Sequence, residues 1–153
     1  MRKSFETTIR VPLPCIEAIE LFTPKGEEAW VPGWNPRYHE PASGETMPGM
    51  VFDTGDGPER TIWTCLDWDP AGGRAHYLRV VPGEGVSRVK VRCSEAGMGQ
   101  SDVTVCYEHT TLSPEGEAWL SGLTQPAFEA EIGQWQGYIE AALAEGRIAG
   151  AAA

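Results

Sequence analysis

Tyr107 and His109 are the residues of this sequence whose types and spacing best suit chemistry. They lie two apart in the segment 102–110, where polar and apolar residues alternate, so both share one face of a predicted strand with two valines. This apolar face should point inward. An imidazole with an ordinary pKa of about 6.5 can act as an acid or a base at neutral pH. The pair therefore consists either of polar anchors for a ligand or of core residues whose polar atoms are satisfied within the protein.

Arg79 is a further candidate, in a predicted strand over residues 74–81. Neither face of this strand is clearly apolar, so its inward face stays undecided. If the face of Tyr77 points inward, Arg79 is a buried guanidinium that needs an anionic partner, either Asp53 or a carboxylate or enolate of a ligand. If that face points outward, Arg79 is solvated. His76 carries the same ambiguity.

Aromatic residues are well suited to line an apolar site, and the chain has six tryptophans. Trp34 lies in a loop between two Pro-containing pairs, where it could gate or line a cavity mouth. Of Trp63 and Trp68, one ring is expected to face inward and the other outward, and packing in the core is the alternative for both. The predicted ligand-binding residues are Trp34, Phe52, Trp63, Tyr77, Tyr107, His109, Phe128 and Trp135. The catalytic candidates are His109, Arg79 and Tyr107.

No metal site and no cofactor are predicted. His39, His76 and His109 have no ligand-like spacing. The four cysteines are widely spaced and include no C-x-x-C pair, so we interpret them as buried reduced thiols. The acidic residues at 27–28 and 129–131 are expected to serve helix ends and solvent-exposed faces.

The charge balance argues against several partners. A net charge of −10 and a pI near 4.7 oppose binding to nucleic acid and to anionic lipid. No apolar run approaches the roughly 18 residues of a membrane span, and the N-terminus lacks the apolar core of a secretion signal. We therefore expect a cytoplasmic protein with no membrane insertion and a small hydrophobic ligand as its partner. An exposed edge strand could support a homodimer.

Hydrophobic periodicity predicts a sheet in the middle of the chain. Five segments between about residues 49 and 110 have a period of two, and short turns rich in Gly, Pro and Asp separate them, which favours antiparallel hairpins. These segments are 50–54, 60–68, 74–81, 86–93 and 102–110. With a first strand at 4–11, six strands are expected.

Helices are predicted on both sides of this meander. Two short helices follow the first strand, the second with Thr23 as N-cap and Pro24 at its first position. A long helix runs from Pro126 to about Glu145, with one apolar stripe made by Phe128, Ile132, Trp135, Ile139 and Leu143. Only one face of the sheet offers a surface for this stripe, so the fold class is α+β, with an antiparallel sheet wrapped around a long C-terminal helix. We expect a single domain at 1–146 and a frayed tail at 147–153.

The order of elements is the helix-grip arrangement, and three stretches of the sequence resemble a known superfamily. Residues 21–34 (LFTPKGEEAWVPGW), 49–54 (GMVFDT) and 110–116 (TTLSPEG) resemble the START/Bet v 1-like (SRPBCC) superfamily. This group includes polyketide cyclase/dehydrase-like proteins, lipid-transfer proteins and a branch of chaperone-ATPase activators. The resemblance spans about residues 4–145. It implies a ligand site between the concave face of the sheet and the long helix.

Members of the superfamily use this ligand cavity for several different functions, so the resemblance leaves more than one function open for this protein. The first is binding or transport of a small hydrophobic or amphipathic ligand in an internal cavity. The second is a cyclase- or dehydratase-like enzyme for a polyketide-like or aromatic substrate, in which His109 is the acid or base and Arg79 or Tyr107 stabilises an enolate. The third is a chaperone-regulating interaction protein, for which an exposed apolar patch would be the signature.

Overall fold

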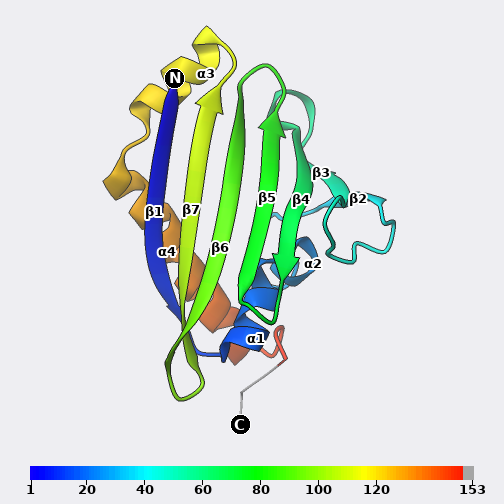
Figure 1. Cartoon of the computed structure of the whole chain (residues 1–153), viewed down its shortest axis with the longest axis vertical. Helices are drawn as coiled ribbons and strands as arrows, with labels where there is room; N and C mark the ends of the chain where they lie inside the picture. Colours follow the sequence, from blue (N-terminus) through cyan, green and yellow to red (C-terminus); the bar gives the residue numbers. More distant parts are fainter. Residues whose placement is uncertain (150–153) are drawn as a thin grey trace.

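The computed structural model describes residues 1–149, which form an antiparallel sheet and a set of helices on its concave side. The sheet has seven strands in the order β1-β7-β6-β5-β4-β3-β2 (Figure 1). Their bounds are β1 Arg2–Val11, β2 Arg37–Glu40, β3 Val51–Thr54, β4 Thr61–Asp69, β5 Arg74–Val81, β6 Gly85–Gly97 and β7 Gln100–Thr111. The six predicted strands are all present, and β6 and β7 are longer than expected because their hairpin continues to a tight turn near Gly97 and Gly99.

The prediction of six strands is wrong by one, because the edge strand β2 was missed. β2 pairs antiparallel with β3, so that Tyr38 lies opposite Phe52. It has four residues, three of them exposed, and lies between Pro36 and Pro41. Such a strand has no alternation of apolar and polar residues, and it is held by hydrogen bonds to its neighbour that leave no local signal in the sequence.

The short helices lie between β1 and β2. They are α1 Cys15–Ala18, the 3-10 helix η1 Ile19–Phe22 and α2 Pro24–Glu27. Thr23 caps α2 as predicted, since its hydroxyl accepts a 2.9 Å hydrogen bond from the Gly26 amide. Ile16 is exposed although Ile19, three residues later, is buried, because the chain changes from α to 3-10 geometry after one turn and the residue spacing changes with it.

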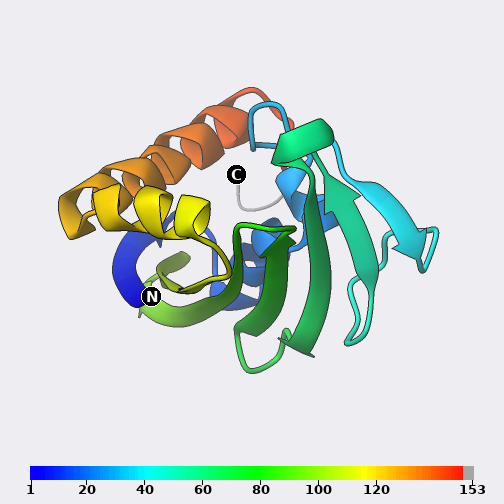
Figure 2. The ribbon, with the colours of Figure 1, turned by 90° about the horizontal axis from the view of Figure 1, so that it is seen from above.

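Two helices follow β7, α3 Pro114–Gly122 and α4 Gln125–Ala144, and a 3-10 turn η2 at Gly57–Glu59 precedes β4. Ser113 and Thr124 cap α3 and α4 through their hydroxyls, and both helices begin with a proline in the first turn. Viewed from above, the sheet curves around one side of α4, with α3 beside the first half of α4 (Figure 2). The sequence predicted this grip of sheet on helix.

The predicted stripe of α4 forms the helix side of the core. Phe128, Ile132 and Ile139 are buried, whereas Trp135 and Leu143 pack against the core while partly exposed. Phe128 stacks on Phe5 of β1 with ring centroids 5.5 Å apart. The stripe therefore ties α4 to the first strand and leaves its central residues facing the rest of the concave sheet.

The tail was expected to fray from residue 147. Arg147 instead donates a hydrogen bond to the carbonyl of Ala29, and Ile148 is buried. Arg147 is thus held against the turn after α2, Ile148 belongs to the hydrophobic core, and residues 150–153 of the expected tail lie outside the described residues. Over residues 1–149, no helix combines the length and hydropathy that crossing a membrane requires.

Candidate functional site

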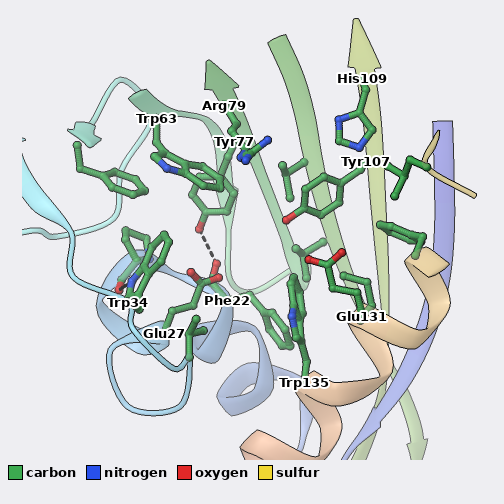
Figure 3. A pocket seen from close by; sticks show the side chains of 18 of the residues that line it. Phe22, Glu27, Trp34, Trp63, Tyr77, Arg79, Tyr107, His109, Glu131 and Trp135 are labelled. Carbon is green, nitrogen blue, oxygen red and sulfur yellow. Dashed lines mark hydrogen bonds between the residues drawn. The ribbon is translucent and has the colours of Figure 1, made fainter. Parts of the chain in front are cut away.

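A cavity of about 260 Å³ lies between the concave face of the sheet and α4, with α2 at one end (Figure 3). All eight predicted ligand-binding residues and all three catalytic candidates line it. They come from the loop after α2 (Trp34), β3 (Phe52), β4 (Trp63), β5 (Tyr77 and Arg79), β7 (Tyr107 and His109) and α4 (Phe128 and Trp135). The structure therefore brings residues from six parts of the chain to one enclosed space.

The register of β5, which the sequence left undecided, places Tyr77 and Arg79 on the concave side. Tyr77 is buried, and its hydroxyl donates a 2.8 Å hydrogen bond to the carbonyl of Phe22 (Figure 3). His76 consequently lies on the opposite face of the strand, outside the cavity. Burial and the nearby charges of Lys90 and Arg88 lower the pKa of His76.

Both Trp63 and Trp68 pack against the core, which corrects the expectation that they face opposite sides. A bulge in β4 between Cys65 and Asp67 shifts the pairing with β5 by one residue. An inserted residue reverses the alternation of side chains beyond it, so residues 63 and 68 share a face despite their odd separation. Trp63 also stacks on Phe52 of the neighbouring strand, with ring centroids 5.7 Å apart.

Trp34 lies edge-on to the Phe52 and Trp63 rings, with its centroid 5.8 Å from that of Trp63. Its indole nitrogen donates a 2.9 Å hydrogen bond to the carbonyl of Pro24. The loop tryptophan is thus fixed as part of one cavity wall, made of three aromatic rings. Trp34 keeps partial exposure, in agreement with the position near a cavity mouth that its loop predicted.

Arg79 projects from β5 toward the cavity, with its guanidinium carbon 5.7 Å from the Trp63 ring centroid. Over residues 1–149 the guanidinium makes no ion pair and no side-chain hydrogen bond. Asp53, its expected protein partner, is instead bonded to the Nε atoms of Arg37 and Arg60 at 2.8 Å each. Asp53 is 3% exposed and lies at the β3 end of the sheet. The alternative of an Asp53–Arg79 pair is excluded, because Arg37 lies opposite Asp53 across the β2–β3 pair and Arg60, in the turn before β4, also reaches Asp53.

His109 is buried beside the cavity, and its Nδ1 lies 2.7 Å from the Ser87 hydroxyl oxygen. Burial, with a smaller effect of the Arg79 charge, lowers the pKa of His109 to about 4, so the ring is neutral at pH 7. The neighbouring Tyr107 has its pKa raised by burial and stays a neutral phenol. The inward orientation predicted for both residues is confirmed.

Glu27 of α2 and Glu131 of α4 also line the cavity (Figure 3). The sequence predicted helix ends and solvent-exposed faces for these acidic residues, and Glu131 is exposed, whereas Glu27 is partly buried. Burial raises the pKa of Glu27 to about 8. Its neighbour Glu28 behaves as expected, since it is exposed and accepts a 2.6 Å hydrogen bond from the Tyr38 hydroxyl. The sequence contained a signal for Glu131, which follows Phe128 by three residues and precedes Trp135 by four, so it lies on the apolar stripe of the helix.

Trp119 and Leu123 also line the cavity and were not predicted. Trp119, on α3, meets the His109 ring edge-on with centroids 5.1 Å apart, although it is 45% exposed. A half-exposed tryptophan on a short helix gives no periodic signal. It covers the cavity only because α3 folds back over the end of β7.

The side chains that line the cavity determine which chemistry the site can support. The walls are aromatic, and Glu27, Arg79, Tyr107, His109 and Glu131 supply polar atoms. Among residues 1–149, no group of three or more His, Cys, Asp or Glu side chains is arranged to hold a metal ion. The side chains themselves can solvate a small aromatic molecule, neutralise an anionic oxygen through Arg79, and exchange a proton through Glu27.

Comparisons with known proteins give matches in structure but not in sequence. No protein-family model and no curated protein matches the chain. Norcoclaurine synthase from Thalictrum flavum superposes with a TM-score of 0.65 at 12% identity, over 92% of this chain and 87% of that one. Ara h 8.0201 gives a TM-score of 0.65 at 19% identity, over 97% and 98% of the two chains. The fold is of the Bet v 1 type.

A third structure extends the comparison to a bacterial enzyme. The Zhui aromatase/cyclase from Streptomyces sp. R1128 matches the Bet v 1-type fold of this chain with a TM-score of 0.58 at 17% identity, over 95% and 93% of the two chains. The START/Bet v 1-like resemblance seen in the sequence is therefore confirmed for the fold. At such identities a common fold does not carry over an activity.

Proposed function

We propose that this protein binds a small aromatic molecule bearing polar groups in the cavity between the sheet and α4. The observation that carries the proposal is the combination of an aromatic wall with polar atoms that have no partner. Arg79 and the Tyr107 hydroxyl make no side-chain hydrogen bond within the part of the chain that the structure describes, and His109 uses only one of its two ring nitrogens.

The unpaired polar atoms that line the cavity remain accessible, since over residues 1–149 the one buried side-chain N or O atom without a hydrogen-bond partner is Nε2 of His76, which lies outside the cavity. A ligand can therefore form hydrogen bonds with these atoms while it buries its own rings against Trp34, Trp63 and Phe128. The volume of about 260 Å³ is slightly below the range of roughly 300–1,000 Å³ common for drug-sized ligands, which favours a molecule of one or two rings.

The structural relatives are consistent with this proposal. Norcoclaurine synthase with the same fold is solved in complex with dopamine and hydroxybenzaldehyde. Another relative is named as an aromatase/cyclase. Both names refer to aromatic molecules, which supports an aromatic ligand for the Bet v 1-type cavity of this chain.

Native mass spectrometry of gently purified protein, followed by titration with 2-naphthol monitored by tryptophan fluorescence, tests the proposal. We expect either a bound mass or a saturable fluorescence change. Val91→Phe, which fills the cavity from β6, should abolish binding. Val80→Phe, on the outer face of β5, is the matched control and should bind as wild type does. Equal binding by correctly folded Val91→Phe, checked by circular dichroism, would place the ligand elsewhere and overturn the proposal.

Acid–base catalysis on the bound molecule is the second candidate, and the raised pKa of Glu27 is the observation that favours it. A carboxyl group with a pKa of about 8 is largely protonated at pH 7 and can donate a proton, while Arg79 can stabilise an enolate in the same cavity. His109, with a pKa of about 4, is a neutral imidazole rather than an imidazolium at pH 7 and is therefore a poor general acid. The role of acid therefore moves from His109, where the sequence suggested it, to Glu27.

A substrate screen with polyketide-like and aromatic carbonyl compounds tests this second candidate. We expect turnover that depends on a group with an apparent pKa near 8 and that is lost in Glu27→Gln, while binding of 2-naphthol persists. His109→Gln should retain turnover. If Glu27→Gln and wild type turn over any accepted substrate equally, Glu27 is not the acid.

A further inference from the structure

We propose that the ligand carries an anionic oxygen conjugated to its ring, a carboxylate or a phenolate, and that this oxygen pairs with Arg79. The inference rests on the proposed binding of an aromatic molecule in the cavity. It goes beyond that function by naming the charged group of the ligand and the residue that selects it.

The first argument is the contrast between Arg79 and three other arginines of the sheet and its turns. Arg37 and Arg60 both bond to Asp53, and Arg74 contacts Asp69 at 2.8 Å, although all three are exposed. Arg79 is less exposed than they are, yet has no carboxylate or carbonyl partner in residues 1–149. A guanidinium loses solvation on entering a cavity, so its lack of a protein anion indicates a space for an anion from elsewhere.

The second argument is the geometry around the guanidinium. Arg79 lies near the Trp63 ring, which itself stacks on Phe52, so an extended aromatic wall borders the cation. Arg79 lines the same cavity as Tyr107 and His109, whose ring centroids are 5.6 Å apart. A ring-bound anionic oxygen would have a planar donor fork in Arg79 and the Tyr107 hydroxyl as a further donor.

The third argument concerns the charges that could compete for Arg79. Burial keeps Glu27 protonated at pH 7, and Tyr107 and His109 are neutral there. Glu131 is the remaining acidic lining residue, and it is exposed, so solvent screens its charge. Arg79 is the one Lys or Arg side chain among the described residues that line the cavity, although the whole chain carries a net charge of −10.

A set of ligands with the same rings and different head groups separates the possibilities. 2-Naphthoate, 2-naphthamide and 2-(aminomethyl)naphthalene are titrated against wild-type protein by calorimetry at neutral pH. We expect 2-naphthoate to bind at least about tenfold more tightly than 2-naphthamide, since the ionic pair adds to a shared hydrophobic contribution. 4-Nitrophenol, compared below and above the pH of its own ionisation, tests a phenolate in place of a carboxylate.

Variants assign the preference to its residue. Arg79→Gln should bind 2-naphthoate and 2-naphthamide equally, and Arg79→Lys should keep part of the preference because it retains charge but loses the fork. Arg88→Gln, an exposed arginine on β6, is the matched control and should retain the full preference. Circular dichroism and thermal unfolding check that each variant is folded.

The failure of this inference is distinguishable from the failure of the proposed function. If naphthoate and naphthamide bind wild type equally, or if the amine binds most tightly, the anionic class is wrong while cavity binding stands. If the preference survives in folded Arg79→Gln, another residue selects the anion and the inference is overturned. If none of the naphthalenes nor 4-nitrophenol binds, both the inference and the proposed function fail.

Discussion

Ser87 and His109 lie opposite each other on β6 and β7, and the Ser87 hydroxyl oxygen is 2.7 Å from Nδ1 of His109. This cross-strand contact fixes the imidazole on the inner face of the sheet and leaves its second nitrogen without a protein partner in residues 1–149. Both residues are buried. The pair is therefore a structural contact that also determines what the cavity presents to a ligand.

Stability should decrease on mild acidification because of His109. Its pKa is about 4 in the folded protein and about 6.5 in the unfolded chain, so between these values the unfolded state binds more protons. The free energy of unfolding should fall as the pH decreases from about 6.5 to about 4, with a slope approaching about 1.4 kcal/mol per pH unit. Urea unfolding across this range measures it. His109→Gln should have a flatter profile, and an unchanged slope would contradict the assignment.

Removing the hydroxyl of Ser87 should destabilise the sheet. Ser87→Ala leaves a buried ring nitrogen without its partner, at an expected cost of about 1–2 kcal/mol in the free energy of unfolding. Ser94→Ala, an exposed serine on the same strand, should change that free energy by less than about 0.5 kcal/mol. Denaturant unfolding of both variants provides the comparison, and equal effects would show that the contact adds nothing.

Glu27→Gln should stabilise the protein increasingly as the pH rises. The folded-state pKa of about 8 lies above the ordinary value near 4.5, so stability from the protonated carboxyl is complete below pH 4.5 and is lost as the pH rises to about 8. Glutamine mimics the protonated form at every pH. Thermal unfolding at several pH values should therefore show a gain over wild type that grows up to about pH 8. Glu28→Gln, at an exposed neighbouring position, should show no such growth.

Asp53→Asn should loosen the edge of the sheet at β2. The arginines that hold Asp53 keep the pKa of its carboxyl well below the usual range, so the ion pairs persist into acid. Without the charge, Arg37 on β2 loses its ion pair with Asp53 of β3, and the backbone pairing of the two strands remains. Hydrogen exchange of the β2 and β3 amides should accelerate several-fold relative to β6 and β7. Asp56→Asn, which removes only an exposed 3.3 Å contact, should leave exchange unchanged.

Much of the candidate site could be predicted because its residues stand in strong local patterns. Tyr107 and His109 follow two valines on an alternating strand, and Phe128 and Trp135 follow a helical repeat, so burial of either pattern brings them to the core. Glu131 stands in the same helical repeat and is exposed, as its charge predicted, but it also lines the cavity.

The sequence by itself determined the order of six of the seven strands, the helix cap at Thr23, and the grip of the sheet on the last helix. These features depend on local periodicity and on hydrogen bonds between residues close in the chain. The tertiary structure alone decided that β2 completes the sheet, that Arg79 faces the cavity, that Asp53 pairs with other arginines, and that Glu27 enters the site. Each of these features depends on contacts between segments that are far apart in the sequence. Strand register and burial determine which of several possible partners a residue meets, and local sequence patterns do not distinguish these partners.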